Sequence, residues 1–142
     1  FGTQFLDADL DGREDLVVAN GHIDDFTYKG YAYRMRPQAF RNLGGRFEEL
    51  PAESLGPFFD RPTLGRGLAR LDWNGDGRDE FAVSCLGDPA VLLTNVAEPV
   101  GHSVSLRLVA TRTARDAIGT VVDVSVAGRR AVRQLTAGDG YA

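Results

Sequence analysis

The chain has 142 residues, of which 43% are hydrophobic and 25% charged, a balance typical of compact globular modules and unlike a disordered or fibrous protein. Twenty acidic against sixteen basic residues give a net charge of −4, which disfavours nucleic-acid binding, and no apolar run approaches the ~18 residues of a membrane-spanning helix. A single cysteine, Cys85, excludes an internal disulfide, and 17 glycines favour tight turns over long helices.

The first predicted unit is an acidic loop that leads into an apolar strand. Carboxylates alternate along the loop at Asp7, Asp9 and Asp11 and return at Asp15, with Gly12 at the sixth position. The residues that follow are apolar at successive positions. They predict an inner strand of a sheet, covered on both faces.

Short strands separated by Gly, Asn, Asp and Pro are expected in this part of the chain. Their predicted ranges are 15–20, 38–42, 46–50, 67–72, 80–86 and 90–95. A hairpin turn is expected at 42–47, because glycines supply the positive φ that such turns need. The only helical feature expected is one turn at 51–55.

A long insertion around residues 24–36 separates the first two of these strands. It contains Asp24 and Asp25 together with Tyr28, Tyr31 and Tyr33. An exposed, tyrosine-rich loop suits recognition of a partner. Packing of the same rings over the rest of the fold is an equally good interpretation.

The acidic loop and its strand recur 65 residues further along. Asp72, Asn74, Asp76 and Glu80 stand at the loop positions of the first copy, and an apolar strand follows again. The segment 92–95 likewise corresponds to 39–42, although the first copy is longer because of its insertion. Recurring strand-like pieces of this kind are typical of stacked repeats and propeller blades.

Alternating carboxylates in a coiled loop are suited to a hard divalent cation, since calcium takes ~6–8 oxygen ligands. An EF-hand is excluded because position 12 is Val18 in one copy and Val83 in the other, where a glutamate is required. We expect each site to close at position 9, with a backbone carbonyl from position 7. The predicted ligands are Asp7, Asp9, Asp11, Arg13 and Asp15 in the first loop, and Asp72, Asn74, Asp76, Arg78 and Glu80 in the second.

Calcium is favoured over magnesium, which prefers a rigid octahedron and retains its waters. We expect two structural sites, the second weaker because Asn74 and Glu80 replace aspartates. Loops rich in Asp, Asn and Gly also form ordinary β-turns without any metal. The repetition of the same register is what favours metal over plain turns.

The composition changes after Pro99. Residues 1–100 carry 17 acidic and 10 basic side chains, whereas residues 101–142 carry 3 and 6. Alternation of apolar and polar residues predicts strands at 103–110 and 122–126, then a turn at Ala127-Gly128 and a further strand at 131–135. The second module is therefore expected to be antiparallel β.

Few residues suit catalysis. A zinc site from His22, His102 and Cys85 is disfavoured because no pair has ligand spacing, and Cys85 lies in an apolar strand as a buried, inert thiol. No serine lies in a nucleophile elbow, and the glycines lack a phosphate-binding register. Paired carboxylates could serve a glycosidase, but here they are concentrated in the metal-like loops. The chain is therefore expected not to be an enzyme.

The loops resemble the calcium-binding FG-GAP/VCBS repeats of integrin-like β-propellers. Asn20-Gly21-His22 and the segments 36–47 and 66–69 are similar to repeats of the cartilage acidic protein family. The segment 111–119, with 115–119 as its core, resembles the ASPIC/UnbV domain of that family, as do the alternating strand and 138–141 after it. The resemblance implies an all-β protein with two propeller-type blades in 1–98 and an ASPIC/UnbV domain in 99–142.

The same resemblance carries expectations about the whole protein. The family's closing segment is missing, and two blades cannot close a ring of about four to eight, so we expect a C-terminal fragment of a longer chain. The implied function is a calcium-stabilised scaffold that binds a protein or glycan in an extracytoplasmic, secreted or cell-surface setting. Some ASPIC/UnbV-like proteins are encoded with natural-product pathways, so an accessory or catalytic biosynthetic role, with its active site outside this segment, is the alternative.

Overall fold

The computed structural model describes residues 2–98 and 101–138, which form two compact units that divide between Ser103 and Val104. The strands of the first unit are β1 (Gly2–Leu6), β2 (Asp15–Ala19), β3 (Gln38–Asn42), β4 (Phe47–Glu49), β5 (Gly65–Leu71), β6 (Glu80–Cys85) and β7 (Asp88–Leu93). Its short helices are η1 (Thr27–Lys29), α1 (Ala52–Leu55) and α2 (Pro57–Asp60), and the second unit contains β8 (Val121–Val126) and β9 (Arg129–Gln134).

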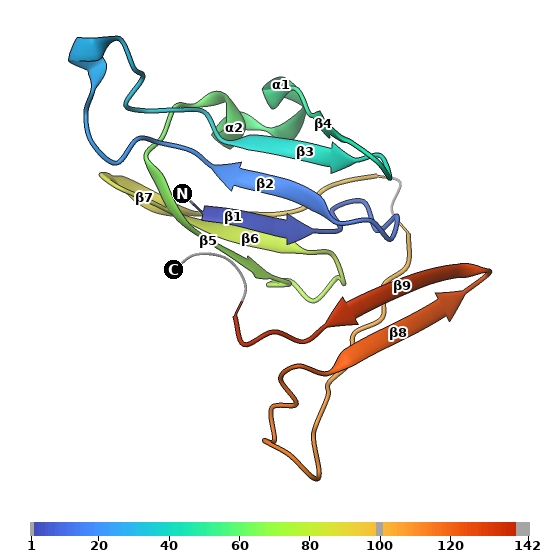
Figure 1. Cartoon of the computed structure of the whole chain (residues 1–142). Helices are drawn as coiled ribbons and strands as arrows, with labels where there is room; N and C mark the ends of the chain where they lie inside the picture. Colours follow the sequence, from blue (N-terminus) through green and yellow to red (C-terminus); the bar gives the residue numbers. More distant parts are fainter. Residues whose placement is uncertain (1, 99–100, 139–142) are drawn as a thin grey trace. The chain divides into compact units, whose positions relative to one another are not determined.

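The prediction of a mostly β chain is confirmed, because every strand pair among the described residues is antiparallel (Figure 1). Within those residues no helix combines the length and the apolar character needed to cross a membrane. The sequence placed the module boundary at 98/99, a few residues before the division that the structure shows.

The first unit contains two sheets, with strand orders β1-β2-β3-β4 and β5-β6-β7. Their strands pair at corresponding positions. Leu6 pairs with Asp15 in the first sheet, and Leu71 pairs with Glu80 in the second. Leu71 and Glu80 lie 65 residues after Leu6 and Asp15, respectively. The two acidic loops therefore connect equivalent strands in equivalent register.

Strand β1 is a correction to the sequence analysis, which predicted no strand at 2–6. Its inward positions are Gly2, Gln4 and Leu6, and its outward ones include the exposed Phe5. Because the buried face contains a glycine and a glutamine, the usual apolar alternation is hidden. Pairing with the apolar strand β2 is what makes this segment a strand.

The two sheets pack through non-equivalent faces. In β2 the buried apolar residues are Val17 and Ala19, whereas in β6 the buried apolar residue is Val83, whose counterpart at the 65-residue offset is the half-buried Val18. Leu68 is likewise buried where its counterpart Thr3 is exposed. The sheets are thus stacked the same way round, head to tail, and not as a two-fold symmetric sandwich.

The stacking is closest where β1 lies beside β5 (Figure 1). A Cβ added to Gly2 would lie 2.7 Å from the backbone nitrogen of Leu68, and one added to Gly65 would lie 2.8 Å from the Cβ of Ala19. Only glycine fits at these two crossings, because real Cβ atoms do not approach other atoms so closely.

The two short helices close the core between β4 and β5. The predicted turn at 51–55 is confirmed as α1, while α2 is a second correction. Phe58 and Phe59 of α2 are buried in the same cluster as the sheet residues, and the Phe59 ring lies edge-on to Phe81, with centroids 6.3 Å apart. An aromatic pair thereby joins the α2 segment to the second sheet.

In the second unit, β8 and β9 form the predicted hairpin, with Ala127 and Gly128 both at positive φ in its turn. The predicted strand at 103–110 is wrong, since those residues form no strand and Val104 and Leu106 are exposed. Alternation marks a segment as amphipathic, but a strand also needs a hydrogen-bonded neighbour. The predicted ASPIC/UnbV feature at 138–141 lies almost wholly outside the described residues.

Candidate metal centre

The first acidic loop folds around its own carboxylates. Asp7 accepts the amide N–H of Asp11 at Oδ1 (2.9 Å) and that of Gly12 at Oδ2 (2.9 Å). Asp9 accepts the Asp11 N–H (3.3 Å), and Asp11 accepts the Arg13 N–H (2.9 Å). These bonds wind the chain so that one oxygen from each of the three aspartates lies within 4.8 Å of the others.

The second loop repeats each of these bonds and adds one, from the Gly75 N–H to Asp72 (2.8 Å). Asp72 accepts the amide N–H groups of Asp76 (3.2 Å) and Gly77 (3.0 Å). Asn74 accepts the Asp76 N–H (3.0 Å), and Asp76 accepts the Arg78 N–H (2.9 Å). The equal spacing of residues along the two loops therefore produces equal backbone geometry.

Position 9 has different surroundings in the two loops. Asp15 accepts the amide N–H of Ala8 at one oxygen (3.2 Å) and that of Asn42 at the other (2.8 Å), so it ties the loop to the end of β3. Asp15 does not belong to the group formed by Asp7, Asp9 and Asp11. Glu80, which is fully buried, accepts the Trp73 N–H (3.1 Å) and the side-chain amide of Asn74 (3.2 Å).

Asn74 accordingly lies between two predicted ligands of the second loop, since its Nδ2 also donates to Asp76 (3.0 Å). The structure brings together Asn74, Asp76 and Glu80 there, and Asp7, Asp9 and Asp11 in the first loop. The side chains of Arg13 and Arg78, whose backbone carbonyls were the predicted ligands, pair with Asp11 and Asp76.

Burial and charge shift the acidities within these loops. Desolvation raises the pKa of Asp7 and of Asp15, although backbone N–H donors act in the opposite direction, and neighbouring aspartates raise both pKa values further. In the second loop the Arg78 guanidinium and amide N–H lower the pKa of Asp76 to about 2. In the first loop Asp7 and Asp15 are therefore stabilised by backbone N–H groups and not by an arginine, whereas Asp11 is paired with Arg13.

Arg41 lies at the candidate site, and the sequence analysis did not include it. Its guanidinium lies 2.5 Å from Asp9 and 3.9 Å from Asp11. It belongs to β3, which reaches the loop only through sheet pairing, and Thr94 stands at the equivalent place in the second repeat. No spacing within the loop could have indicated it.

Asn42 and Asn95 are a second missed pair, for which a sequence signal existed. They stand at matching places in the two repeats, and each donates a side-chain hydrogen bond to the backbone carbonyl of the residue before position 9. Asn42 donates to Glu14 (3.0 Å), and Asn95 donates to Asp79 (3.2 Å). Asn95 also donates to the carbonyl of Ala8 (2.7 Å), so it joins the second repeat to the first loop.

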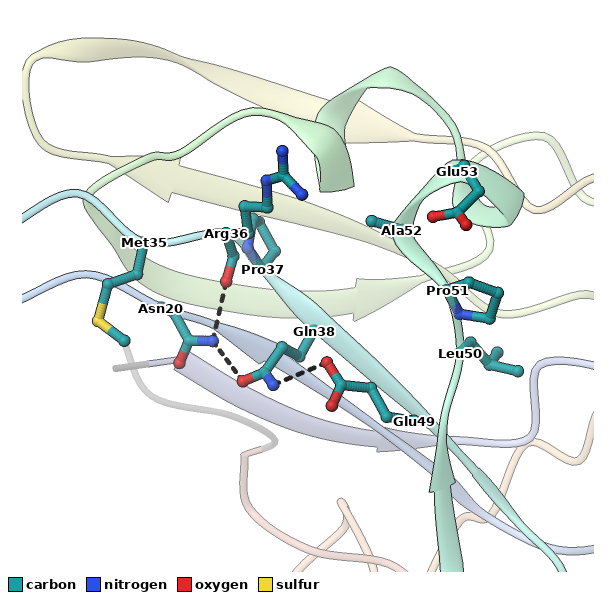
Figure 2. A pocket seen from close by; sticks show the side chains of 10 residues that line it. All are labelled: Asn20, Met35, Arg36, Pro37, Gln38, Glu49, Leu50, Pro51, Ala52 and Glu53. Carbon is teal, nitrogen blue, oxygen red and sulfur yellow. Dashed lines mark hydrogen bonds between the residues drawn. The ribbon is translucent and has the colours of Figure 1, made fainter. Parts of the chain in front are cut away.

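A separate hollow of about 570 Å³ lies beside β3 and β4 and is drawn in Figure 2. Asn20 donates to Gln38 (2.8 Å) and to the carbonyl of Arg36 (2.9 Å), and Gln38 donates to Glu49 (2.8 Å). These polar groups satisfy one another, so they brace the ends of β2, β3 and β4 and do not form a nucleophile–base pair.

The other candidates for chemistry lie apart from both loops. Cys85 is half-buried and not fully buried as predicted, and desolvation raises the pKa of its thiol, which disfavours the reactive thiolate. The His22 ring packs against the rings of Phe26 and Tyr31.

Comparison with protein-family models, with curated proteins and with solved structures gave no match. The residues and geometry of this chain therefore carry the functional argument alone.

Proposed function

We propose that the chain is a calcium-stabilised, non-catalytic binding scaffold whose first unit consists of two propeller-type blades. The observation that carries the proposal is the grouping of Asp7, Asp9 and Asp11, with one oxygen of each within 4.8 Å of the others. Three like charges this close repel one another; Arg13 and Arg41 compensate part of that charge, and a bound divalent cation would compensate the rest.

The second loop supports the same proposal. Its backbone follows the same hydrogen bonds, and it brings Asp76 and Glu80 to either side of the Asn74 amide. Oxygen donors alone suit a hard cation, and the flexible arrangement of a loop suits calcium better than magnesium. We propose that the first loop binds calcium more tightly, because it offers one more carboxylate among these positions.

The blade assignment is supported by the direction of stacking. The two sheets pack through non-equivalent faces. The face of the first sheet that corresponds to the packed face of the second therefore stays uncovered, and the same holds for the second sheet. On the outer face of the first sheet, Phe5 and Phe47 are 49% and 47% exposed, with ring centroids 6.4 Å apart. Further repeats of the same kind would cover this face, as neighbouring blades do in a propeller.

The proposed setting is extracytoplasmic because the resemblance to FG-GAP/VCBS and ASPIC/UnbV proteins implies it, and calcium sites of extracellular modules have Kd values of ~10⁻⁴–10⁻³ M. Calcium at millimolar concentration fills such sites. A protein or glycan partner would then bind to loops that the two metal sites hold in place.

The test is the thermal unfolding of this chain in excess EDTA, in millimolar calcium and in millimolar magnesium. Calcium at 100 times its Kd should stabilise each independent site by about 2.7 kcal/mol, which raises Tm by several degrees. Asp9→Ala should remove most of this rise, whereas Glu53→Ala, which alters an exposed residue of α1 and none of the predicted ligands, should retain it.

A Tm that does not depend on calcium in the wild-type chain would contradict the proposal, and both loops would then be ordinary turns without a metal. An equal response to magnesium would contradict the choice of metal.

A further inference from the structure

The insertion between β2 and β3 gathers aromatic side chains on an exposed loop. The His22 and Phe26 rings meet edge to face with centroids 5.9 Å apart, His22 lies 6.3 Å from Tyr31, and Phe26 lies 6.2 Å from Tyr28. Tyr28 and Tyr31 are nevertheless 75% and 60% exposed. These four residues are called the aromatic cluster below.

The cluster is held in place by the second repeat. Arg66 of β5 donates to the carbonyl of His22 (2.8 Å), and Arg34 forms an ion pair with Asp88 of β7 (2.7 Å). The amide of His22 also donates to the carbonyl of Tyr33 (2.9 Å), which closes the base of the loop. In Figure 1 the loop extends beyond the end of β2. A surface braced in this way has already lost the conformational freedom that binding would otherwise remove.

The cluster borders a hollow of about 250 Å³ lined by His22, Phe26, Lys29 and Tyr31. The Lys29 ammonium lies 5.2 Å from the centroid of Phe26 and 5.5 Å from that of Tyr28. Both distances are within the ≈ 6 Å over which a ring face attracts a cation. The protein's own lysine thus shows which ligand chemistry these rings accept.

The neighbouring charges also favour a cation. Asp24 and Asp25 are exposed on the same loop. Thr27 holds the pKa of Asp25 below its ordinary value through its hydroxyl and amide, so this carboxylate is ionised at neutral pH. These two carboxylates attract a cation from solution and offset the positive charge of Lys29.

We propose that the aromatic cluster is a binding site for a quaternary ammonium group of the choline type, which displaces the Lys29 ammonium from the ring faces. Methyl groups on the cation would contact the apolar lining of the hollow, and such a cation loses less hydration than a primary ammonium does. The site is separate from the acidic loops, so its occupancy does not depend on calcium.

The test is a titration of the full chain with choline, followed by the NMR signals of the aromatic ring protons, in calcium and again in EDTA. The expected result is saturable shifts on Phe26 and Tyr28 under both conditions. The uncharged analogue 3,3-dimethylbutan-1-ol has the same shape, and it should bind at least a few-fold more weakly because it lacks the cation–π term.

Two substitutions test the contributions of the rings and of Lys29 to choline binding separately. Phe26→Leu should weaken choline binding a few-fold, and Lys29→Met should strengthen it by a similar factor because the internal competitor is gone. Phe47→Leu, which alters an exposed aromatic residue on the first sheet, is the matched control and should leave binding unchanged. An unchanged melting curve verifies that each variant is folded.

Three outcomes would overturn the proposal: no saturable shift with choline, equal binding of the uncharged analogue, or no gain from Lys29→Met. Sedimentation with phosphatidylcholine vesicles identifies the source of the cation. Co-sedimentation lost in Phe26→Leu would show that a lipid headgroup supplies it, and its absence alongside choline binding would show a free solute.

Discussion

The two acidic loops share a backbone but differ in how their negative charge is balanced. In the first, three aspartates converge and the nearest compensating group outside the loop is Arg41. In the second, the amide of Asn74 lies between Asp76 and Glu80 and donates to both. The carboxylates of the first loop are thus faced by an arginine from another strand, whereas Asp76 and Glu80 accept hydrogen bonds from a side chain of their own loop. Equal backbone geometry does not imply equal ion affinity.

The two sheets differ as well, because several equivalent positions differ in burial, such as the buried Leu68 and the exposed Thr3. The largest predicted effect tests this difference. Leu68→Ala should lower the free energy of unfolding by about 2–5 kcal/mol, whereas Thr3→Ala at the equivalent exposed position should change it by less than about 0.5 kcal/mol. Urea unfolding measures both. Similar losses at the two positions would show that the sheets pack through equivalent faces.

Exchanging the residues at loop position 3 should exchange the metal properties of the loops. Asp9→Asn should weaken calcium binding to the first loop roughly tenfold, and Asn74→Asp should strengthen binding to the second by a similar factor, since affinity follows the count of charged ligands. Calorimetric titration with calcium measures both affinities. If neither substitution alters them, position 3 does not contact the metal.

Removal of the competing cation should have a smaller effect, confined to the first loop. Arg41→Gln leaves Asp9 without its ion pair, so calcium affinity should rise a few-fold while the metal-free protein loses about 0.2–1 kcal/mol of stability. Thr94→Gln, at the equivalent place in the second repeat, is the control. Weaker calcium binding in Arg41→Gln would mean that the arginine supports the site and does not compete for it.

The smallest effect concerns pH and the second loop. The pKa of Asp76 is lowered to about 2, so its stabilising contribution is complete above the ordinary value of 3.8 and is lost as the pH falls toward 2. Arg78→Gln should raise this pKa toward 3.8. An NMR titration of the carboxyl group in EDTA measures the shift, and an unchanged pKa in the variant would remove Arg78 as the cause.

The local features of the fold were open to prediction from the sequence. The hydrogen bonds that shape each acidic loop join residues two to five positions apart, so the order of Asp, Asn and Gly in the chain determines them. The hairpin turns after β3 and β8 are local for the same reason. The strands β2, β3 and β6 were predicted because their apolar character is visible within five or six residues.

Features that depend on a distant partner were not open to prediction in this way. Strand β1 can be recognised only from its pairing with β2. The segment 103–110 has an alternating sequence but forms no strand. Arg41 contacts Asp9 only because the strands of the sheet pair. The sequence by itself determined the two loops and most of the strands. Which face of each sheet is buried, and that Arg41 stands beside Asp9, became visible only in the folded structure, because both depend on groups that folding brings together from far along the chain.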